Sequence, residues 1–435
     1  MNTLKNYLVG FLVLFVSQVW AQGGKQKLVF SLEECIAFAL ENSNNQQSLY
    51  LDKAYGEAGL KQSKQEWLPQ VYGTASQGFN NYNSAPIGGT NPSWSGNYAI
   101  NAGMTVWNGG QINLNVKQNR LMTELNNLQI EQAENQLTIR VIQAFLSVIG
   151  YDELLKFQQE ALILSKMQAE KGKVKLTAGQ ILESDYLLLE AQLAGDKYNI
   201  VNSENARNNN MLALYNLLSL RSGQSLEIVA PDHNEIKNMT IIPDLNTVVE
   251  LALRNLPELR ISQQNIELAK NSVKLAATAY YPSLSLNAGI GSGYASGSGN
   301  FENQLSNRFN QNVTLNMNIP IYSKGKTKSS VQQYKIREEQ AILRHDQTKL
   351  DIAQQVETEY QNIVAISNKY NTAEIKFNAT AASYNAYEKQ FDAGSITVTD
   401  LLLQKNNHIN AFTDMVQSKY SYILERKILD IYMGQ

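Results

Sequence analysis

Proline is distributed so unevenly along this chain that very long helices are expected. None of the eight prolines lies between residues 93 and 230 or after residue 320. A proline inside a helix costs about 3 kcal/mol, so long helices are confined to such stretches. Both stretches are rich in helix-forming residues, and their apolar residues recur at mixed spacings of three and four, typical of coiled coils. We therefore predict helices over 110–173 and 325–389, each about 90–100 Å long at 1.5 Å per residue.

The chain also repeats itself at an offset of 213–215 residues. Four segments of the first half recur in the same order in the second half: residues 31–42 match 244–255, 67–69 match 280–282, 104–110 match 319–325, and 178–185 match 393–400. Self-similarity at one nearly constant offset indicates two copies of one structural unit.

We expect a first repeat over 22–220, a connector over 221–243 and a second repeat over 244–435. A short helix opens each repeat, N-capped by Ser31 (in a capping box with Glu34) and by Asp244. The further elements expected are strands at about 68–82 and 97–107 and helices at 110–173 and 179–219 in the first repeat, and strands at about 281–293 and 310–322 and helices at 325–389 and 396–433 in the second.

The amino terminus has the pattern of a Sec signal peptide. Lys5 precedes an apolar run over residues 8–19, and small or aliphatic residues follow up to Ala21. The run is short for a transmembrane helix, and an uncleaved anchor is the alternative. We predict that residues 1–21 are removed after export. Because no other segment has 18 consecutive apolar residues, any insertion into a membrane must use strands.

The strand predicted near residue 315 alternates between apolar and uncharged polar residues. Its apolar positions share one face and are expected to face lipid: Val313, Leu315, Met317 and Ile319. Such alternation over nine or ten residues is typical of a transmembrane β-strand. A soluble antiparallel sheet with one wet face is the alternative. Aromatic residues favour the membrane reading, because they mark the strand–helix junctions where an interface selects them: Trp67, Trp107, Tyr280, Tyr281 and Tyr322.

Four strands are too few to close a sheet on itself. An open strand edge exposes unpaired peptide groups, which lipid cannot satisfy. We therefore expect the chain to take strands from other chains.

Composition excludes several other functions. The 37 basic and 39 acidic residues leave no basic excess that would favour nucleic acid or an anionic membrane surface. One cysteine, Cys35, and three scattered histidines leave no disulfide framework and no metal-ligand spacing. No Ser-His-Asp spacing or phosphate-binding loop is present. We predict no catalysis, no cofactor and no bound metal.

The signal peptide, duplicated halves, strand pairs, long helices and the Ala-Gly-x-Ile-x-x-(Ser/Thr)-Asp turns at 178–185 and 393–400 together resemble the TolC family of outer-membrane efflux proteins. The resemblance implies a mainly α fold with a β-barrel part. Antiparallel coiled-coil-like helices would form a periplasmic tunnel, and four transmembrane strands per chain would complete a 12-stranded barrel in a homotrimer. The protein would lie in the cell outer membrane with most of the chain in the periplasm.

The same resemblance implies a passive exit duct that docks onto a periplasmic adaptor protein and an inner-membrane pump of RND or ABC type. The docking tips would include Lys171, Lys173, Lys175, Ala178, Gly179, Ala393, Gly394 and Ser395. Asp185 and Asp400 match aspartates that narrow the closed periplasmic aperture. Phe391, Ile396 and Leu403 depart from the family residues that lock it, so we expect this aperture to be held by packing.

Two alternatives stay open. The chain could be the outer-membrane component of a type I protein secretion system. It could also be a structural, periplasm-spanning or adhesin-like coiled-coil protein. Drugs, metal ions, dyes and secreted proteins are all compatible as cargo.

Overall fold

The computed structural model describes residues 27–81, 83, 91–220, 225–230, 242–297 and 299–434. The signal peptide predicted over 1–21 and most of the predicted connector, at 221–224 and 231–241, lie outside the described residues.

The chain divides into two compact units, and each takes segments from both halves of the sequence. The first, called the helical unit, comprises Met1–Gln47, Ala133–Asn255 and Ala353–Gln435. The second, called the sheet unit, comprises Ser48–Gln132 and Leu256–Ile352. The two longest helices, α4 (Gln111–Thr177) and α10 (Lys326–Asp392), contribute to both units. Each has 67 residues, which confirms the prediction of very long helices.

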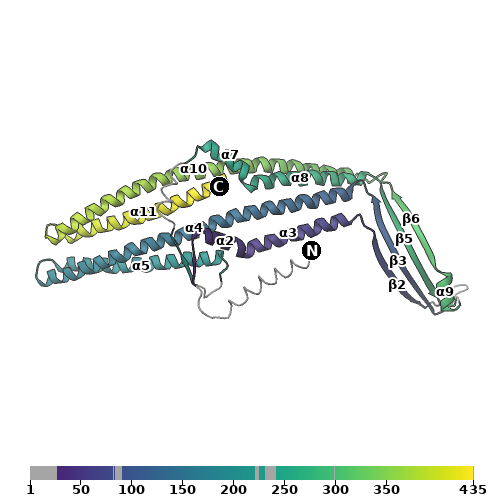
Figure 1. Cartoon of the computed structure of the whole chain (residues 1–435), viewed down its shortest axis with the longest axis horizontal. Coiled ribbons are helices and arrows are strands. Elements are labelled where there is room, and N and C mark those ends of the chain that lie inside the picture. Colours follow the sequence, from purple (N-terminus) through teal and green to yellow (C-terminus); the bar gives the residue numbers. More distant parts are fainter. Residues whose placement is uncertain are drawn as a thin grey trace, which may run out of the picture. The chain divides into compact units, whose positions relative to one another are not determined.

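Two helical hairpins make up most of the described part of the helical unit (Figure 1). The end of α4 pairs with α5 (Glu183–Leu217), and the end of α10 pairs with α11 (Val398–Met433). The shorter elements are α2 (Leu32–Asn42), α7 (Leu245–Asn255), and the strands β1 (Lys27–Phe30) and β4 (Ser225–Ile228), which pair in parallel.

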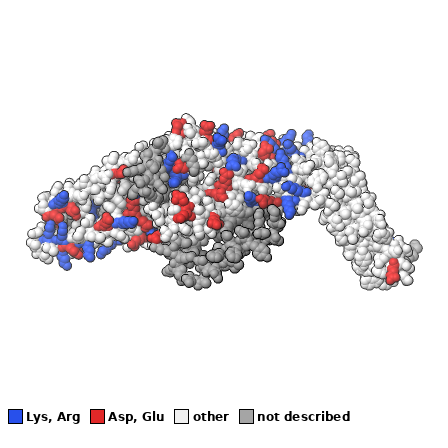
Figure 2. All heavy atoms as spheres, in the orientation of Figure 1, with Lys and Arg blue, Asp and Glu red and all other residues white. Residues whose placement is uncertain are grey.

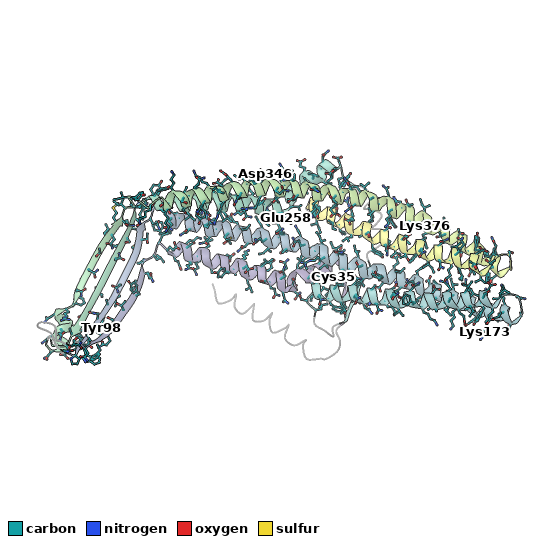
Figure 3. The ribbon with its side chains drawn as sticks, turned by 180° about the vertical axis from the view of Figure 1, so that it is seen from behind. Cys35, Tyr98, Lys173, Glu258, Asp346 and Lys376 are labelled. Atoms are coloured by element: carbon teal, nitrogen blue, oxygen red, sulfur yellow. The ribbon has the colours of Figure 1, made fainter. Side chains whose placement is uncertain are left out.

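The main core of the helical unit lies between α2, α4, α5 and α11. Fully buried residues such as Val141, Phe145 and Leu214 form it. Helix α2 begins with the predicted capping box, in which the Ser31 N–H donates to Glu34 Oε2 at 2.7 Å and the Glu34 N–H donates to Ser31 Oγ at 3.3 Å. Cys35 lies within this core (Figure 3), and burial raises the pKa of its thiol to about 12. The thiol therefore stays protonated at neutral pH.

The sheet unit contains a four-stranded antiparallel sheet with the order β2-β3-β5-β6. Its elements are α3 (Asn44–Gln65), β2 (Gln70–Asn80), β3 (Ser93–Trp107), α8 (Pro257–Ala277), the 3-10 turn η1 (Thr278–Tyr280), β5 (Ser283–Ala295), α9 (Phe301–Asn307) and β6 (Asn310–Asn318).

Strand β6 is shorter than expected from the sequence. Its alternation continues to Ile321, but the strand ends at Asn318. Pro320 has no N–H to donate to a neighbouring strand, which explains the early end. Ile319, predicted as a lipid-facing strand residue, therefore lies one position beyond the strand, although its side chain is exposed.

Helix α8 joins the sheet unit's two long helix segments through polar contacts. Asn271 Nδ2 donates to the Leu114 carbonyl of α4 at 2.9 Å, and Gln264 Nε2 donates to the Leu121 carbonyl at 3.0 Å. On the other side, Ser262 Oγ lies 2.8 Å from His345 Nδ1 of α10. Among the helices in the described part of the chain, none combines the length and the apolar character needed to cross a membrane.

Candidate functional site: the helix turns and the two faces of the sheet

The turns that connect α4 to α5 and α10 to α11 have the same backbone structure. After α4, the Gly179 N–H donates to the Leu176 carbonyl at 2.9 Å and the Gln180 N–H donates to the Lys175 carbonyl at 2.8 Å. After α10, Gly394 and Ser395 make the equivalent bonds at 3.0 and 2.9 Å. This is the Schellman ending of a helix, which needs a residue with positive φ. Gly179 (φ +68°) and Gly394 (φ +76°) supply it.

Most of the predicted tip residues are exposed at these turns. Ala178, Gly179, Ala393, Gly394 and Ser395 all lie on the surface. A Cβ at Gly179 or Gly394 would meet no atom within 4 Å, so only the backbone conformation requires glycine there. The turns are therefore accessible to a partner.

The three predicted tip lysines differ in their surroundings. Lys171 Nζ pairs with Asp392 Oδ2 at 3.0 Å and so links α4 to α10. Lys175 Nζ donates to the Phe391 carbonyl at 3.2 Å and lies 4.5 Å from the centre of the Phe391 ring. Lys173, near the end of α4 (Figure 3), is exposed and has no ion pair among the described residues. Lys173 is thus the tip lysine whose charge is free for a partner.

The two predicted aperture aspartates also differ. Asp400 belongs to a capping box at the start of α11, where its Oδ2 accepts from Thr397 Oγ1 at 2.6 Å. Leu182 occupies the corresponding N-cap of α5 and has no side-chain cap, because leucine carries no acceptor. Asp185 therefore follows the same turn without this capping partner.

A hydrophobic cluster lies directly behind the turns and joins the two hairpins. Phe391, Val398 and Leu401 are buried in it together with Leu189 of α5, and Ile396 packs against it. Leu403, in contrast, is exposed. Within one chain, Phe391 and Ile396 thus contribute to packing, whereas Leu403 does not.

A buried ion pair, which was not predicted from the sequence, crosses between the same hairpins. Lys405 of α11 is 2% exposed, and its Nζ lies 2.9 Å from Oδ2 of Asp196 on α5, which is 4% exposed. Lys405 also donates to Ser165 Oγ and to the Ala161 carbonyl of α4. Ser165 Oγ and Gln192 Nε2 donate to the two carboxylate oxygens of Asp196. Both charges are therefore satisfied inside the unit.

The buried position of Lys405 next to Asp196 affects the pKa of Lys405 in two opposite ways. Burial lowers the pKa of its ammonium group, and the neighbouring Asp196 carboxylate counteracts part of this effect.

In the sequence, Lys405 follows Leu401 and Leu402 at the spacing of a helix's buried face. A charged residue on the buried face of a helix was therefore the sequence signal for a buried charge.

The sheet has one apolar face that extends across β3, β5 and β6. Leu315 of β6 pairs with Leu286 of β5, which pairs with Met104 of β3. Residues opposite one another in antiparallel strands share a face, so these side chains form one row. On β6, Val313, Leu315 and Met317 are 76%, 61% and 62% exposed.

The opposite face is polar but carries no charge. Asn312 of β6, Gly289 of β5 and Asn101 of β3 are successive register partners. A Cβ on Gly289 would lie 2.7 Å from Asn312 Oδ1 and 3.0 Å from Asn101 Oδ1, so both amides lean over the glycine. The amides line a hollow of about 730 Å³ at the end of the sheet that meets α3 and α4. None of the residues in β2, β3, β5 or β6 is charged.

Aromatic side chains mark both ends of the strands. The predicted residues Trp67, Trp107, Tyr280, Tyr281 and Tyr322 are exposed near the strand–helix junctions, where the Trp107 and Tyr281 rings lie 6.3 Å apart. A second group at the opposite strand ends was missed. It includes Phe79 and Trp94, whose ring centres are 4.7 Å apart. Their place in or next to the segment between the strands predicted over 68–82 and 97–107 was the sequence signal.

Comparison with known proteins identifies this architecture. The chain is 22% identical over 425 residues to the outer membrane protein TolC of Vibrio cholerae, covering 94% of this chain and 90% of the relative. It is 23% identical to the alkaline protease secretion protein AprF of Pseudomonas aeruginosa, covering 71% and 64%. The CmeC outer membrane channel of Campylobacter jejuni superposes with a TM-score of 0.80 at 19% identity, covering 93% and 85%.

The fold, with its long helices and its four-stranded sheet, is thus similar to that of the CmeC outer membrane channel. Residues 248–435 match the family described as Outer membrane efflux protein. Together with the TolC relative, this match confirms the predicted resemblance to the TolC family of outer-membrane efflux proteins and agrees with the predicted location in the outer membrane. None of the three named relatives is named as an enzyme.

Proposed function

We propose that the protein is the passive exit duct of a tripartite efflux or export system. One observation carries this proposal most directly: the sheet has an exposed apolar face, an uncharged polar face and two open edges, β2 and β6. The apolar face suits lipid, and the amide-lined face suits a water-filled lumen. The duct supplies no energy of its own, so transport is driven by a partner.

The open edges support a homotrimer. Neither β2 nor β6 contains a proline or a charged residue, the usual devices that protect a free edge. In lipid such edges must be paired, and strands of two further copies would pair them in a closed barrel of 12 strands. The long helices of the three copies would then enclose the periplasmic tunnel.

The turns support docking to a periplasmic adaptor, and through it to an inner-membrane pump of RND or ABC type. Their exposed backbone allows close approach, and Lys173 offers an unpaired charge to an acidic contact. Likeness to AprF, a protease secretion protein, favours a type I protein secretion system as the second candidate. Both candidates use the same duct and differ in the pump and the cargo.

A purified full-length chain tests the proposal. We expect a trimer in detergent, measured by light scattering, and discrete ion conductance after insertion into planar bilayers. A monomer that inserts into no bilayer would overturn the duct and favour the structural rod instead.

Neutralising the aspartates should alter ion selectivity at the periplasmic aperture. In a trimer, Asp185 and Asp400 would place six carboxylates near the axis, which favour cations. We expect Asp185→Asn with Asp400→Asn to lower the cation-to-anion permeability ratio about twofold or more, measured as the reversal potential in a salt gradient.

The matched control is Glu160→Gln, which removes one exposed carboxylate from α4 at a distance along the helix from the turn. It should leave the selectivity unchanged. Equal selectivity of the parent and the double variant would contradict the assignment of these aspartates to the aperture.

A further inference from the structure

Basic residues are concentrated where the helices meet the strands. The four helix ends next to the sheet, residues 58–67, 109–120, 268–281 and 322–332, contain nine lysines and arginines but one acidic residue, Glu66. The whole chain, in contrast, has 37 basic and 39 acidic residues. We call the nine the basic collar: Lys61, Lys64, Lys117, Arg120, Lys270, Lys274, Lys324, Lys326 and Lys328. The balanced total charge therefore hides a strong local excess.

The charges of the collar are largely unneutralised within the chain. Eight of the nine side chains are exposed, and only Lys270 has an ion pair among the described residues, with Glu267 at 2.9 Å. Hydrogen bonding to Lys270 lowers the pKa of Glu267, and the charges of Lys117 and Lys274 add to this effect. One carboxylate thus lies among three ammonium groups from two helices. Without a partner, these groups repel one another.

The collar lies where a membrane would end. The strands carry no charge, the junction aromatics follow, and the basic residues lie within about three helical turns of them. Figure 2 shows this arrangement: Lys and Arg gather on the helices beside the nearly uncharged strand region. A lipid headgroup layer is about 5–8 Å thick, and flexible lysine side chains extend toward it.

We propose that the basic collar binds the anionic phospholipid headgroups of the membrane leaflet on the helical side of the sheet. This proposal rests on the proposed function, because it requires the strands to lie in a membrane. Phosphate groups there would neutralise the collar and fix the depth at which the strands are inserted. Electrostatic attraction of this kind acts over about one Debye length, about 8 Å at physiological salt.

Tryptophan fluorescence provides a direct test, because Trp67 and Trp107 lie at the junction next to the collar. The full chain with Trp20→Phe and Trp94→Phe is reconstituted into vesicles that contain phosphatidylcholine and phosphatidylglycerol, with one or the other brominated in its acyl chains. We expect brominated phosphatidylglycerol to quench more strongly, and this preference to vanish near 1 M salt, where the Debye length is about 3 Å.

In the same background, Lys324→Gln, Lys326→Gln and Lys328→Gln together should lower the relative association constant for phosphatidylglycerol about fivefold or more. The matched control removes three exposed lysines of α10 that lie outside the collar, Lys349→Gln, Lys369→Gln and Lys389→Gln, and should retain the preference.

Each other outcome contradicts the proposal in a distinguishable way. Equal quenching by both lipids, or an equal loss in the control variant, would overturn the collar and leave the duct intact. If the variant lacking Lys324, Lys326 and Lys328 loses anion conductance in planar bilayers but keeps its preference for phosphatidylglycerol, these lysines belong to the lumen instead. Quenching by neither lipid would show that the strands do not lie in a bilayer, and would overturn the proposed function as well.

Discussion

Replacing Leu315 by arginine should prevent the protein from assembling stably in a membrane. Leu315 lies near the middle of β6 on the apolar face, and its side chain is 61% exposed in the single chain. An arginine on the lipid face near the middle of a bilayer costs about 2–4 kcal/mol. Because a trimer would contain three copies, we expect most of the protein to be lost from the membrane fraction. Extraction of outer membranes followed by immunoblotting measures this loss.

Asn316→Arg is the matched control, since it introduces the same charge one residue away on the polar face. We expect this variant to insert, because its guanidinium would reach water in the lumen. It should also make the conductance less cation-selective. Equal loss of the two variants from the membrane would contradict the assigned orientation of the sheet.

Features that depend on local periodicity could be predicted from the sequence. The proline-free stretches predicted helices that are found as α4 and α10. The alternation around Leu315 predicted which residues share a face, and the register pairs show the same faces on β5 and β3. In each case the pattern is repeated many times within one element, so no knowledge of distant contacts was needed.

Features that depend on a tertiary partner could not be predicted. Lys405 and Asp196 are 209 residues apart in the sequence, and no pattern within either helix indicates that they pair. The basic collar is likewise assembled from four separate segments, whose local excess disappears in the total charge. At the predicted aperture, the sequence repeat placed Asp185 and Asp400 at equivalent positions of the two turns. Their difference arises because Thr397 can cap its helix and Leu182 cannot.

Removing the ammonium group of Lys405 should strongly destabilise the helical unit. Lys405→Met keeps the length of the side chain but leaves Asp196 as a buried carboxylate without its counter-ion. Breaking a buried ion pair in this way costs about 3–5 kcal/mol. We expect the urea midpoint of the helical circular dichroism signal to fall accordingly.

The double variant Lys405→Met with Asp196→Leu distinguishes a lost ion pair from lost packing. Replacing both partners by apolar residues removes the uncompensated charge, so most of the lost stability should return. Lys376→Met is the surface control, because Lys376 (Figure 3) pairs with Asp414 at 2.9 Å between α10 and α11 while both side chains are about half exposed. Exposed pairs contribute about 0–1 kcal/mol. If the double variant is as unstable as Lys405→Met, the two hairpins are held by the shape of these side chains rather than by their charges.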